Sequence, residues 1–298
     1  TGRYEVMSLG GAIKHENYNA VRTDEWKELW TIVPVDSYGD PAIIRSALRD
    51  VKPDMIWFMT DPRFWVWLWQ LEHEIRPLCP MVYYHVWDNY PYPMYNKKWY
   101  KSNDVVCTIS KVTDDIVKTV APDVESYYIP HAVDTDVFKK INQMEVINNK
   151  IQTLGSEAKD KFVFVWNNRN ARRKQSGSLL FWFKEFLDKV GNDEACLIMH
   201  TEPTDPNGQD LREILKYLEL VDGQVLLSTQ KYPPEHLAMM YNIADCTINV
   251  SDAEGFGLAT LESLACQTPI IATMTGGLQE QITNGEEWFG IGLEPASK

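Results

Sequence analysis

Short apolar runs alternate with amphipathic helical patterns along most of this chain, and this alternation constrains its fold more than any other feature. The runs are bounded by Pro, Asp, Gly or Asn, a pattern typical of buried strands in a parallel sheet. Asp61 is expected to cap a helix that Pro62 begins. In the first part of the chain, we expect strands at residues 6–9, 55–59, 81–86 and 105–109 and helices at residues 41–51 and 62–75.

Residues 139–161 are polar and give weak strand signals, and the alternation restarts after them. Strands that alternate with helices indicate βαβ units and a parallel sheet. We therefore predict two doubly wound α/β domains, residues 1–140 and 161–298, joined by a linker or connecting helix at residues 141–160. The later strands are expected at residues 162–166, 196–200, 225–227, 246–250 and 269–272, and the later helices at 179–190, 211–218, 235–244 and 258–266.

Charge and cysteine content exclude several classes of partner and site. The chain has 29 Lys and Arg against 42 Asp and Glu, and its net charge of −13 has the wrong sign for wrapping nucleic acid. Its five cysteines are scattered without a Cys-x-x-Cys pair, which predicts neither disulfides nor a zinc site and favours a reducing cytosol. No run approaches the roughly 18 apolar residues of a membrane span. We expect a cytoplasmic protein and leave peripheral membrane contact open.

The segment 251–262 carries the most chemical information, because it follows a buried strand and opens directly into a helix. Gly255 and Gly257 allow the backbone to approach a ligand closely, and the free amides at the helix start form a site suited to phosphate. Glu254 and Glu262 flank that site. A phosphate repels carboxylates unless they accept hydrogen bonds from neutral hydroxyls, such as those of a sugar. A sugar attached to a nucleotide diphosphate meets both conditions, whereas the alternative is a tight turn with Glu262 in solvent.

The Glu-x7-Glu array from Glu254 to Glu262, together with residues 265–272 and 276–280, resembles glycosyltransferase family 4. Members of that family are retaining, metal-independent enzymes with the GT-B fold. The similarity covers most of the chain from about Met81 to Leu293. Further segments that resemble the family are residues 102–110, 129–138, 169–174 and 241–246.

The resemblance implies a GT-B architecture, in which two Rossmann-like domains with doubly wound parallel sheets face a cleft. Residues 1–140 would form the acceptor-side domain and residues 161–298 the domain that binds the nucleotide sugar. Residues 4–9 resemble the family's second strand, so the first βα unit and the C-terminal helices would lie outside this sequence. The implied reaction moves a hexose-type sugar from a nucleotide diphosphate to an acceptor hydroxyl by front-face displacement. The donor base, the oligomeric state and the acceptor, whether glycan, lipid or small molecule, stay open.

Arg169 and Lys174 lie in the loop after a buried strand, where open α/β sheets bind ligands. By resemblance they are the family's diphosphate pair, and together they could stabilise the leaving group. His85 ends a strand and precedes an aromatic loop, and the resemblance places it near the donor sugar. The expected catalytic residues are Glu254, His85, Arg169 and Lys174. The expected donor-binding residues are Arg169, Lys174, Glu254, Gly255, Phe256, Gly257, Leu258 and Glu262.

Asp134 and Asp136 form an Asp-x-Asp pair, which binds a metal in the other large glycosyltransferase fold. Here the pair matches the family's crossover between domains and lacks partners for an oxygen shell. We therefore predict no metal and no cofactor. Four histidines also show no ligand-type spacing, namely His73, His131, His200 and His236.

Two other functions remain open at this stage. A sugar-nucleotide epimerase with the same architecture would release a changed nucleotide sugar, and a non-catalytic binding subunit would bind the nucleotide without turnover.

Overall fold

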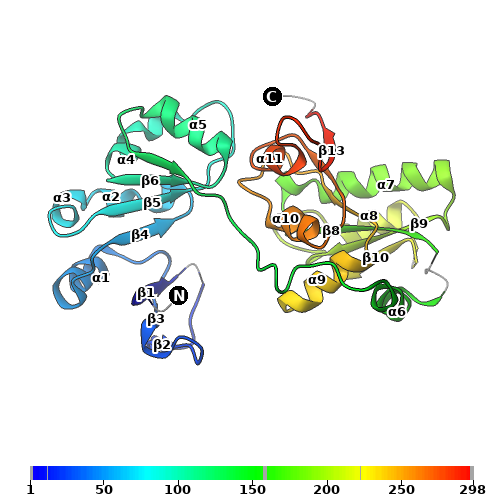
Figure 1. Ribbon diagram of the computed structural model, residues 1–298, viewed down its shortest axis with the longest axis horizontal. Helices are drawn as coiled ribbons and strands as arrows, with labels where there is room; N and C mark the ends of the chain where they lie inside the picture. Colours follow the sequence, from blue (N-terminus) through cyan, green and yellow to red (C-terminus); the bar gives the residue numbers. More distant parts are fainter. Residues whose placement is uncertain (1–2, 12, 157–159, 222, 296–298) are drawn as a thin grey trace. The chain divides into compact units, whose positions relative to one another are not determined.

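The computed structural model describes residues 3–11, 13–156, 160–221 and 223–295 (Figure 1). It divides into two compact units, which are treated separately below. The first unit comprises Thr1–Val86, Tyr92–Thr108 and Asp114–Tyr127, and the second comprises Trp87–Pro91, Ile109–Thr113 and Tyr128–Lys298.

The first unit contains two sheets. The smaller has the order β1-β3-β2, in which β3 pairs in parallel with β1 and antiparallel with β2. The larger has the order β4-β5-β6-β7, and β4, β5 and β6 are parallel. The strands are β1 (Val6–Gly10), β2 (Val21–Arg22), β3 (Trp30–Pro34), β4 (Ile56–Met59), β5 (Met81–His85), β6 (Val105–Thr108) and β7 (Ser126–Tyr128).

The helix expected at residues 41–51 is present as α1 (Pro41–Ser46), which continues into the π-helical turn η2 (Ala47–Val51). Asp40 caps α1 by accepting hydrogen bonds from the amides of Ala42 and Ile43. Further helices are α4 (Lys97–Lys101) and α5 (Lys111–Val120), of which α5 lies in the first unit from Asp114 on, and two short 3-10 turns are η1 (Lys27–Leu29) and η4 (Met94–Asn96).

The prediction of a single helix at residues 62–75 is wrong. The segment forms three short pieces, η3 (Pro62–Phe64), α2 (Val66–Trp69) and α3 (Glu72–Ile75), and the Asp61 side chain makes no cap hydrogen bond. Asp61 instead pairs with Arg63 at 2.9 Å. The indole of Trp65 donates to Met59 O at 2.8 Å and that of Trp69 to Asn103 Oδ1 at 3.0 Å. Contacts of these large side chains therefore set the chain path here in place of helix propensity.

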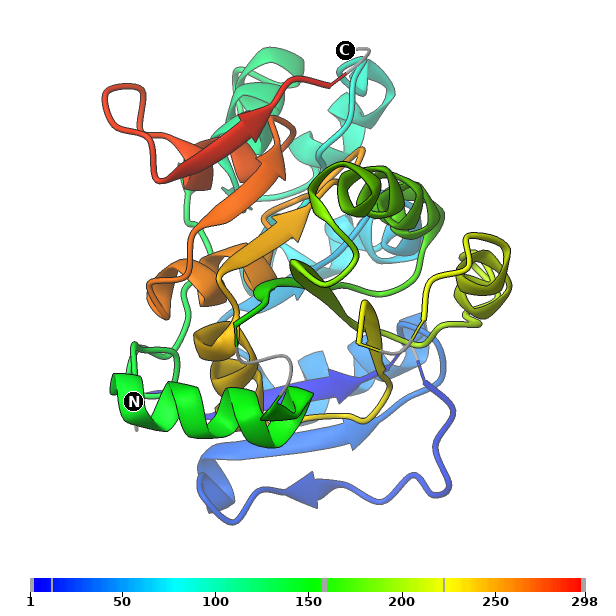
Figure 2. The same cartoon turned by 90° about the vertical axis from the view of Figure 1, so that its right-hand side faces the viewer.

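The second unit is built on one six-stranded sheet with the order β10-β9-β8-β11-β12-β13. All its strand pairs are parallel, and Figure 2 shows β11, β12 and β13 side by side. The chain runs outward from β8 in one direction and from β11 in the other, so the switch point lies between β8 and β11. The strands are β8 (Phe162–Asn167), β9 (Ala195–His200), β10 (Val225–Ser228), β11 (Cys246–Asn249), β12 (Ile270–Thr273) and β13 (Gly290–Leu293).

Helices cover both faces of this sheet, as a doubly wound fold requires. On one face, Trp166 packs with Leu180 and Leu187, and on the other, Val163 and Val165 lie in a separate core. The strands and helices predicted for residues 162–272 are thereby confirmed, with small shifts at their ends. The helices are α6 (Gln143–Leu154), α7 (Ser176–Val190), α8 (Leu211–Tyr217), α9 (Pro234–Ile243), α10 (Leu258–Ala265) and α11 (Leu278–Ile282).

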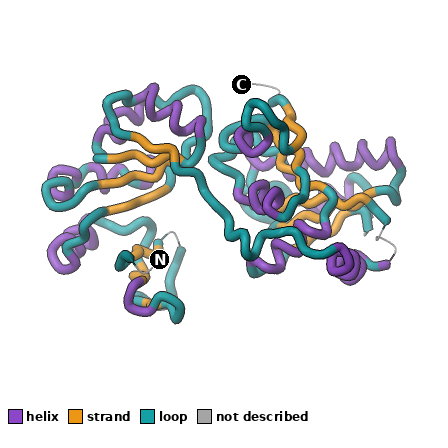
Figure 3. Tube along the Cα trace, in the orientation of Figure 1, coloured by secondary structure: helices purple, strands orange, loops and turns teal. Residues whose placement is uncertain are grey.

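The segment expected to connect the domains contains α6 (Figure 3). Asn142 caps this helix by accepting a hydrogen bond from the Glu145 amide at 2.9 Å. Lys150 donates to Lys161 O at 2.8 Å and pairs with Asp245 at 3.3 Å. These contacts fasten α6 to the second unit.

Candidate functional site

Three loops meet at the carboxyl edge of the second unit's sheet, where β8, β11 and β12 end. The Asp252 amide donates to Arg173 O at 2.8 Å, and Gln175 Nε2 donates to Asp252 Oδ2 at 2.6 Å. The Gly277 amide donates to Glu254 O at 2.9 Å and so fastens the loop after β12 to the same place. Because β8 and β11 flank the switch point, these loops lie where open α/β sheets bind ligands.

Two glycines make this arrangement possible. Gly257 has a φ of 90°, a conformation that favours glycine, and a Cβ atom there would lie 2.6 Å from Leu278 Cδ2. Gly276 has a φ of 47°, and a Cβ atom there would lie 2.0 Å from Glu254 O. Gly257, one of the two glycines singled out in the sequence, and Gly276 therefore set the path of the loop that carries Glu254.

The carbonyl groups of this loop are tied to buried side chains. Gln281 Nε2 donates to Phe256 O at 2.6 Å and to Gly257 O at 3.2 Å, and Thr260 Oγ1 donates to Gly257 O at 2.7 Å. Within the described part of the chain, no group accepts a hydrogen bond from the amides of Leu258 and Ala259, the first residues of α10. These amides, at the positive end of the helix dipole, suit an anion such as phosphate.

Lys174 and Glu254 lie together at this edge. Lys174 is only 6% exposed, and its Nζ is in direct contact with Glu254 Oε2. Arg173 Nη1 donates to Ala253 O at 2.5 Å and lies 3.5 Å from Glu254 Oε2. Burial and the Arg173 guanidinium lower the pKa of Lys174 to about 7, and the Asp88 carboxylate opposes this shift. A buried ammonium needs a counter-charge, which Glu254 supplies here.

Arg169 makes a different ion pair. Its Nε lies 2.6 Å from Asp205 Oδ2 and its Nη2 lies 3.2 Å from Asp205 Oδ1, while its side chain is 64% exposed. The Arg169 guanidinium lowers the pKa of Asp205 to about 2. No hydrogen bond or ion pair in the described ranges joins Arg169 to Lys174 or Glu254. The two members of the expected diphosphate pair are therefore held by different carboxylates, and their joint role stays a prediction.

Glu262 lies in the middle of α10, as expected, and is half-buried. Its Oε2 accepts a hydrogen bond from the Tyr241 hydroxyl at 2.7 Å, and Tyr241 in turn accepts one from Asn167 Nδ2 at 2.8 Å. Burial raises the pKa of Glu262, and the hydrogen bond from Tyr241 opposes that rise. Sequence reasoning missed Tyr241 and Asn167 as site residues, although Asn167 directly follows a predicted strand and Tyr241 opens a segment that resembles the family.

His85 belongs to the first unit and is completely buried. Its Nδ1 lies 2.9 Å from the Tyr83 hydroxyl and its Nε2 lies 2.7 Å from the Tyr100 hydroxyl. Burial lowers the pKa of His85 to about 3, so the imidazole is neutral. Its contact with a donor sugar stays a prediction.

The Asp134–Asp136 pair forms a local turn, in which Asp134 Oδ1 accepts a hydrogen bond from the Asp136 amide at 2.8 Å. No cluster of three or more His, Cys, Asp or Glu side chains suited to a metal occurs within the described residues. None of the helices in the described part of the chain combines the length and apolar character needed to cross a bilayer.

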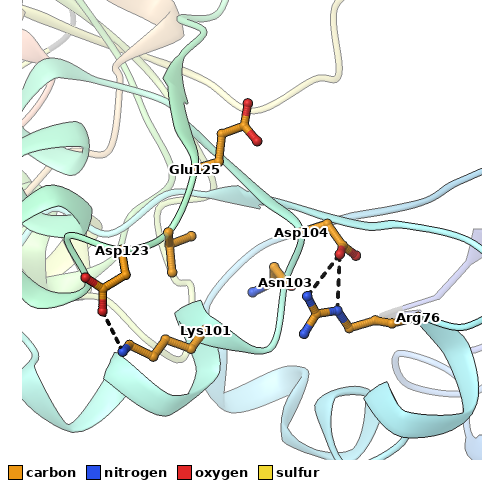
Figure 4. A pocket seen from close by; sticks show the side chains of 7 residues that line it. Arg76, Lys101, Asn103, Asp104, Asp123 and Glu125 are labelled. Carbon is orange, nitrogen blue, oxygen red and sulfur yellow. Dashed lines mark hydrogen bonds and ion pairs between the residues drawn. The ribbon is translucent and has the colours of Figure 1, made fainter.

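A separate pocket of about 410 Å³ lies in the first unit, beside the residues that precede β6 and β7 (Figure 4). Its main charges are already paired: Arg76 lies 3.0 Å from Asp104 and Lys101 lies 2.8 Å from Asp123. It contains none of the predicted site residues and lies at the amino ends of the strands. The loops at the carboxyl edge of the second unit's six-stranded sheet therefore remain the candidate site.

Comparison with known proteins yields a family. The sequence profile described as "Glycosyl transferases group 1" matches residues 147–296, which is 150 of the 298 residues. The D-inositol 3-phosphate glycosyltransferase of Corynebacterium jeikeium (strain K411) is 29% identical over 160 residues, which cover 53% of this chain and 38% of that protein. The match thus spans about two fifths of this curated relative's length.

Solved structures with similar folds extend the likeness to most of the chain. Sucrose-phosphate synthase from Thermosynechococcus elongatus has a TM-score of 0.74 at 16% identity. The match covers 95% of this chain and 74% of the synthase chain. Anabaena HepE in complex with UDP-glucose has a TM-score of 0.70 at 16% identity. The match covers 89% of this chain and 72% of the HepE chain. At such low identity these likenesses concern the fold, and they confirm the predicted GT-B architecture. The second unit has the predicted doubly wound parallel sheet, whereas the first unit has two sheets, and β2 and β3 of the smaller one are antiparallel.

Proposed function

Because this chain belongs to the group 1 glycosyltransferases, we propose that it transfers a hexose-type sugar from a nucleotide diphosphate to an acceptor hydroxyl. The observation that carries this proposal is the buried Lys174–Glu254 pair at the same sheet edge as the amides of Leu258 and Ala259, which have no acceptor among the described residues. It offers a cation and amides to a diphosphate, and a carboxylate to sugar hydroxyls. The UDP-glucose bound to HepE supports a nucleotide sugar as donor.

Donor binding would exchange the partners of Lys174. The diphosphate replaces Glu254 as the counter-ion of the ammonium, and Glu254 then accepts hydrogen bonds from the sugar. Lys174 and the amides of α10 stabilise the negative charge that develops on the leaving diphosphate. Arg169 joins them by exchanging Asp205 for phosphate, an exchange that its exposure allows.

We propose that the reaction retains the anomeric configuration and needs no metal ion. The acceptor oxygen attacks on the face from which the diphosphate leaves. The bond from the anomeric carbon to the phosphate oxygen breaks, a bond to the acceptor oxygen forms, and the acceptor proton passes to the leaving diphosphate. In this scheme, side chains and helix amides neutralise the leaving group.

The test is a turnover assay of the 298-residue chain with UDP-, GDP- and ADP-sugars and a panel of hydroxyl acceptors, with and without EDTA. We expect release of nucleoside diphosphate, a product with the donor's anomeric configuration by NMR, and equal rates in EDTA. A rate that EDTA abolishes and Mn²⁺ restores would contradict the metal-independent scheme. A changed free nucleotide sugar would identify an epimerase, and binding of a nucleotide sugar without turnover would favour a non-catalytic subunit.

Donor affinity should depend on pH through Lys174. Its pKa is about 7 in the free protein, and a bound diphosphate favours the ammonium, so the pKa is higher in the complex. Affinity should therefore be highest below pH 7 and fall by up to about tenfold per pH unit above it, until the pKa of the complex is reached. Calorimetric titration with UDP from pH 6 to pH 9 measures this profile.

The matched control is Lys174→Arg, because a guanidinium keeps its charge throughout this pH range. This variant should flatten the alkaline fall in affinity even if its absolute affinity is lower. An equally steep fall in Lys174→Arg would assign the titration to another group.

We also propose that the protein works in the cytoplasm, which is a reducing compartment. All five cysteines are free and buried, which supports this location.

A further inference from the structure

The Tyr241 hydroxyl connects three elements of the second unit. Tyr241 lies on α9 and is completely buried, with its ring in the apolar core beneath the sheet. Its oxygen lies 2.8 Å from Asn167 Nδ2, at the end of β8, and 2.7 Å from Glu262 Oε2, on α10. A tyrosine hydroxyl in an apolar core is costly to bury unless it is hydrogen-bonded, and here both partners are polar side chains of the site.

The direction of these two bonds follows from the chemistry of the groups. An ionised carboxylate only accepts hydrogen bonds, and a tyrosine hydroxyl has one proton to donate. That proton must go to Glu262, so Asn167 must present its NH2 group to Tyr241. Asn167 thus orients the hydroxyl, and the hydroxyl orients the carboxylate.

The second oxygen of Glu262 is left for a ligand. Within the described residues no hydrogen bond to Glu262 Oε1 is formed, and the side chain is half-buried. We propose that Tyr241, held by Asn167, is a positioning residue that fixes Glu262 as the acceptor for the ribose hydroxyls of the nucleotide. This inference rests on the proposed function, because it assumes a nucleotide at this edge of the sheet.

The charge state of Glu262 supports the same role. Burial raises the pKa of Glu262, while the hydrogen bond from Tyr241 opposes that rise and favours the carboxylate. Cys266, at the end of α10, also interacts with Glu262, and burial raises the pKa of this thiol to about 11, so that it is neutral. Loss of the Tyr241 hydroxyl would leave Glu262 more easily protonated and a poorer acceptor.

The test uses Tyr241→Phe, which keeps the ring and removes only the hydroxyl. Calorimetric titration with UDP, and in parallel with GDP and ADP, should show affinity about tenfold weaker than in the wild type at pH 7. The loss of affinity at acid pH should also begin at a higher pH than in the wild type. A purely structural tyrosine would not shift this acid limb.

Ser263→Ala is the matched control. Ser263 lies next to Glu262 on α10 and is completely buried, and its hydroxyl donates to Thr247 Oγ1 at 2.8 Å. This variant also loses a buried hydroxyl, but that hydroxyl bonds to Thr247 and Thr268 and not to Glu262, so its nucleotide affinity and pH profile should match the wild type.

A double-mutant cycle separates the loss of Glu262 positioning from a general loss of stability in the Tyr241→Phe variant. If Tyr241 acts through Glu262, Tyr241→Phe should cost little further affinity in a Glu262→Gln background. An equal loss in both backgrounds, or wild-type affinity in folded Tyr241→Phe, would overturn the inference while the wild type still binds nucleotide. If the wild type binds none of the three diphosphates, the proposed function fails and this inference fails with it.

Discussion

Lys174→Ala is expected to lower kcat/KM by about a hundredfold or more and to weaken nucleoside diphosphate binding by about 1.5 to 3 kcal/mol. The ammonium is buried and is in direct contact with Glu254, which precedes α10, so no solvent ion replaces it well. Its loss also leaves Glu254 beside an incoming phosphate without its closest counter-charge, which adds repulsion to the lost attraction. Calorimetry with UDP, GDP and ADP separates the binding loss from the loss of turnover.

Two further variants calibrate this result. Arg169→Ala should lose less, because the Arg169 side chain is exposed and must first leave Asp205. Lys184→Ala removes an ion-paired lysine on α7, which pairs with Asp188, and should leave binding unchanged. Unaltered diphosphate affinity in a folded Lys174→Ala would refute the phosphate role assigned to this side chain.

The two units differ in how far their folds could be predicted. In the second unit, strands such as β8, with Val163 and Val165, are buried because helices cover both faces of the sheet. Strands of this kind form continuous apolar runs and are recognisable from composition alone. In the first unit, the strand β3 was not predicted. It ends in a proline and its residues are only partly buried, so it lacks the apolar run that marks a buried strand. Residues 62–75 begin with an Asp-Pro helix start, but they form three short pieces, and the indoles of Trp65 and Trp69 bond to Met59 and Asn103.

The candidate site shows a similar division. The residue types and the glycine positions were readable, because a loop that opens a helix needs glycine where φ is positive, as at Gly257. The partner of each charged side chain was not readable. Lys174 and Glu254 are 80 positions apart, and Arg169 and Asp205 are 36 positions apart. Such pairs form only when parallel strands bring their carboxyl ends to one edge, and one-dimensional spacing does not specify which loops then touch.

The two glutamates are expected to give variants that differ in kind. Glu254→Gln should lower turnover by about a hundredfold while leaving the affinity for free nucleoside diphosphate unchanged or slightly higher. The reason is that Glu254 competes with phosphate for Lys174, and a neutral amide competes less. Glu262→Gln should weaken the binding of nucleoside diphosphate and intact donor alike, by about 1 to 3 kcal/mol. Calorimetric titration of both variants with diphosphate and donor, beside kcat measurements, resolves the two effects.

This contrast depends on where each carboxylate lies relative to the phosphate site. Glu254 precedes α10 and faces the cation that would hold the phosphate, whereas Glu262 lies one turn into α10, beside Tyr241. A ligand whose phosphate sits on the first amides of α10 would therefore reach Glu254 and Glu262 with different parts of its structure. Equal losses of diphosphate affinity in the two variants would mean that both carboxylates contact the same part of the ligand. No loss of binding or turnover in either variant would reduce the Glu-x7-Glu segment to a structural turn.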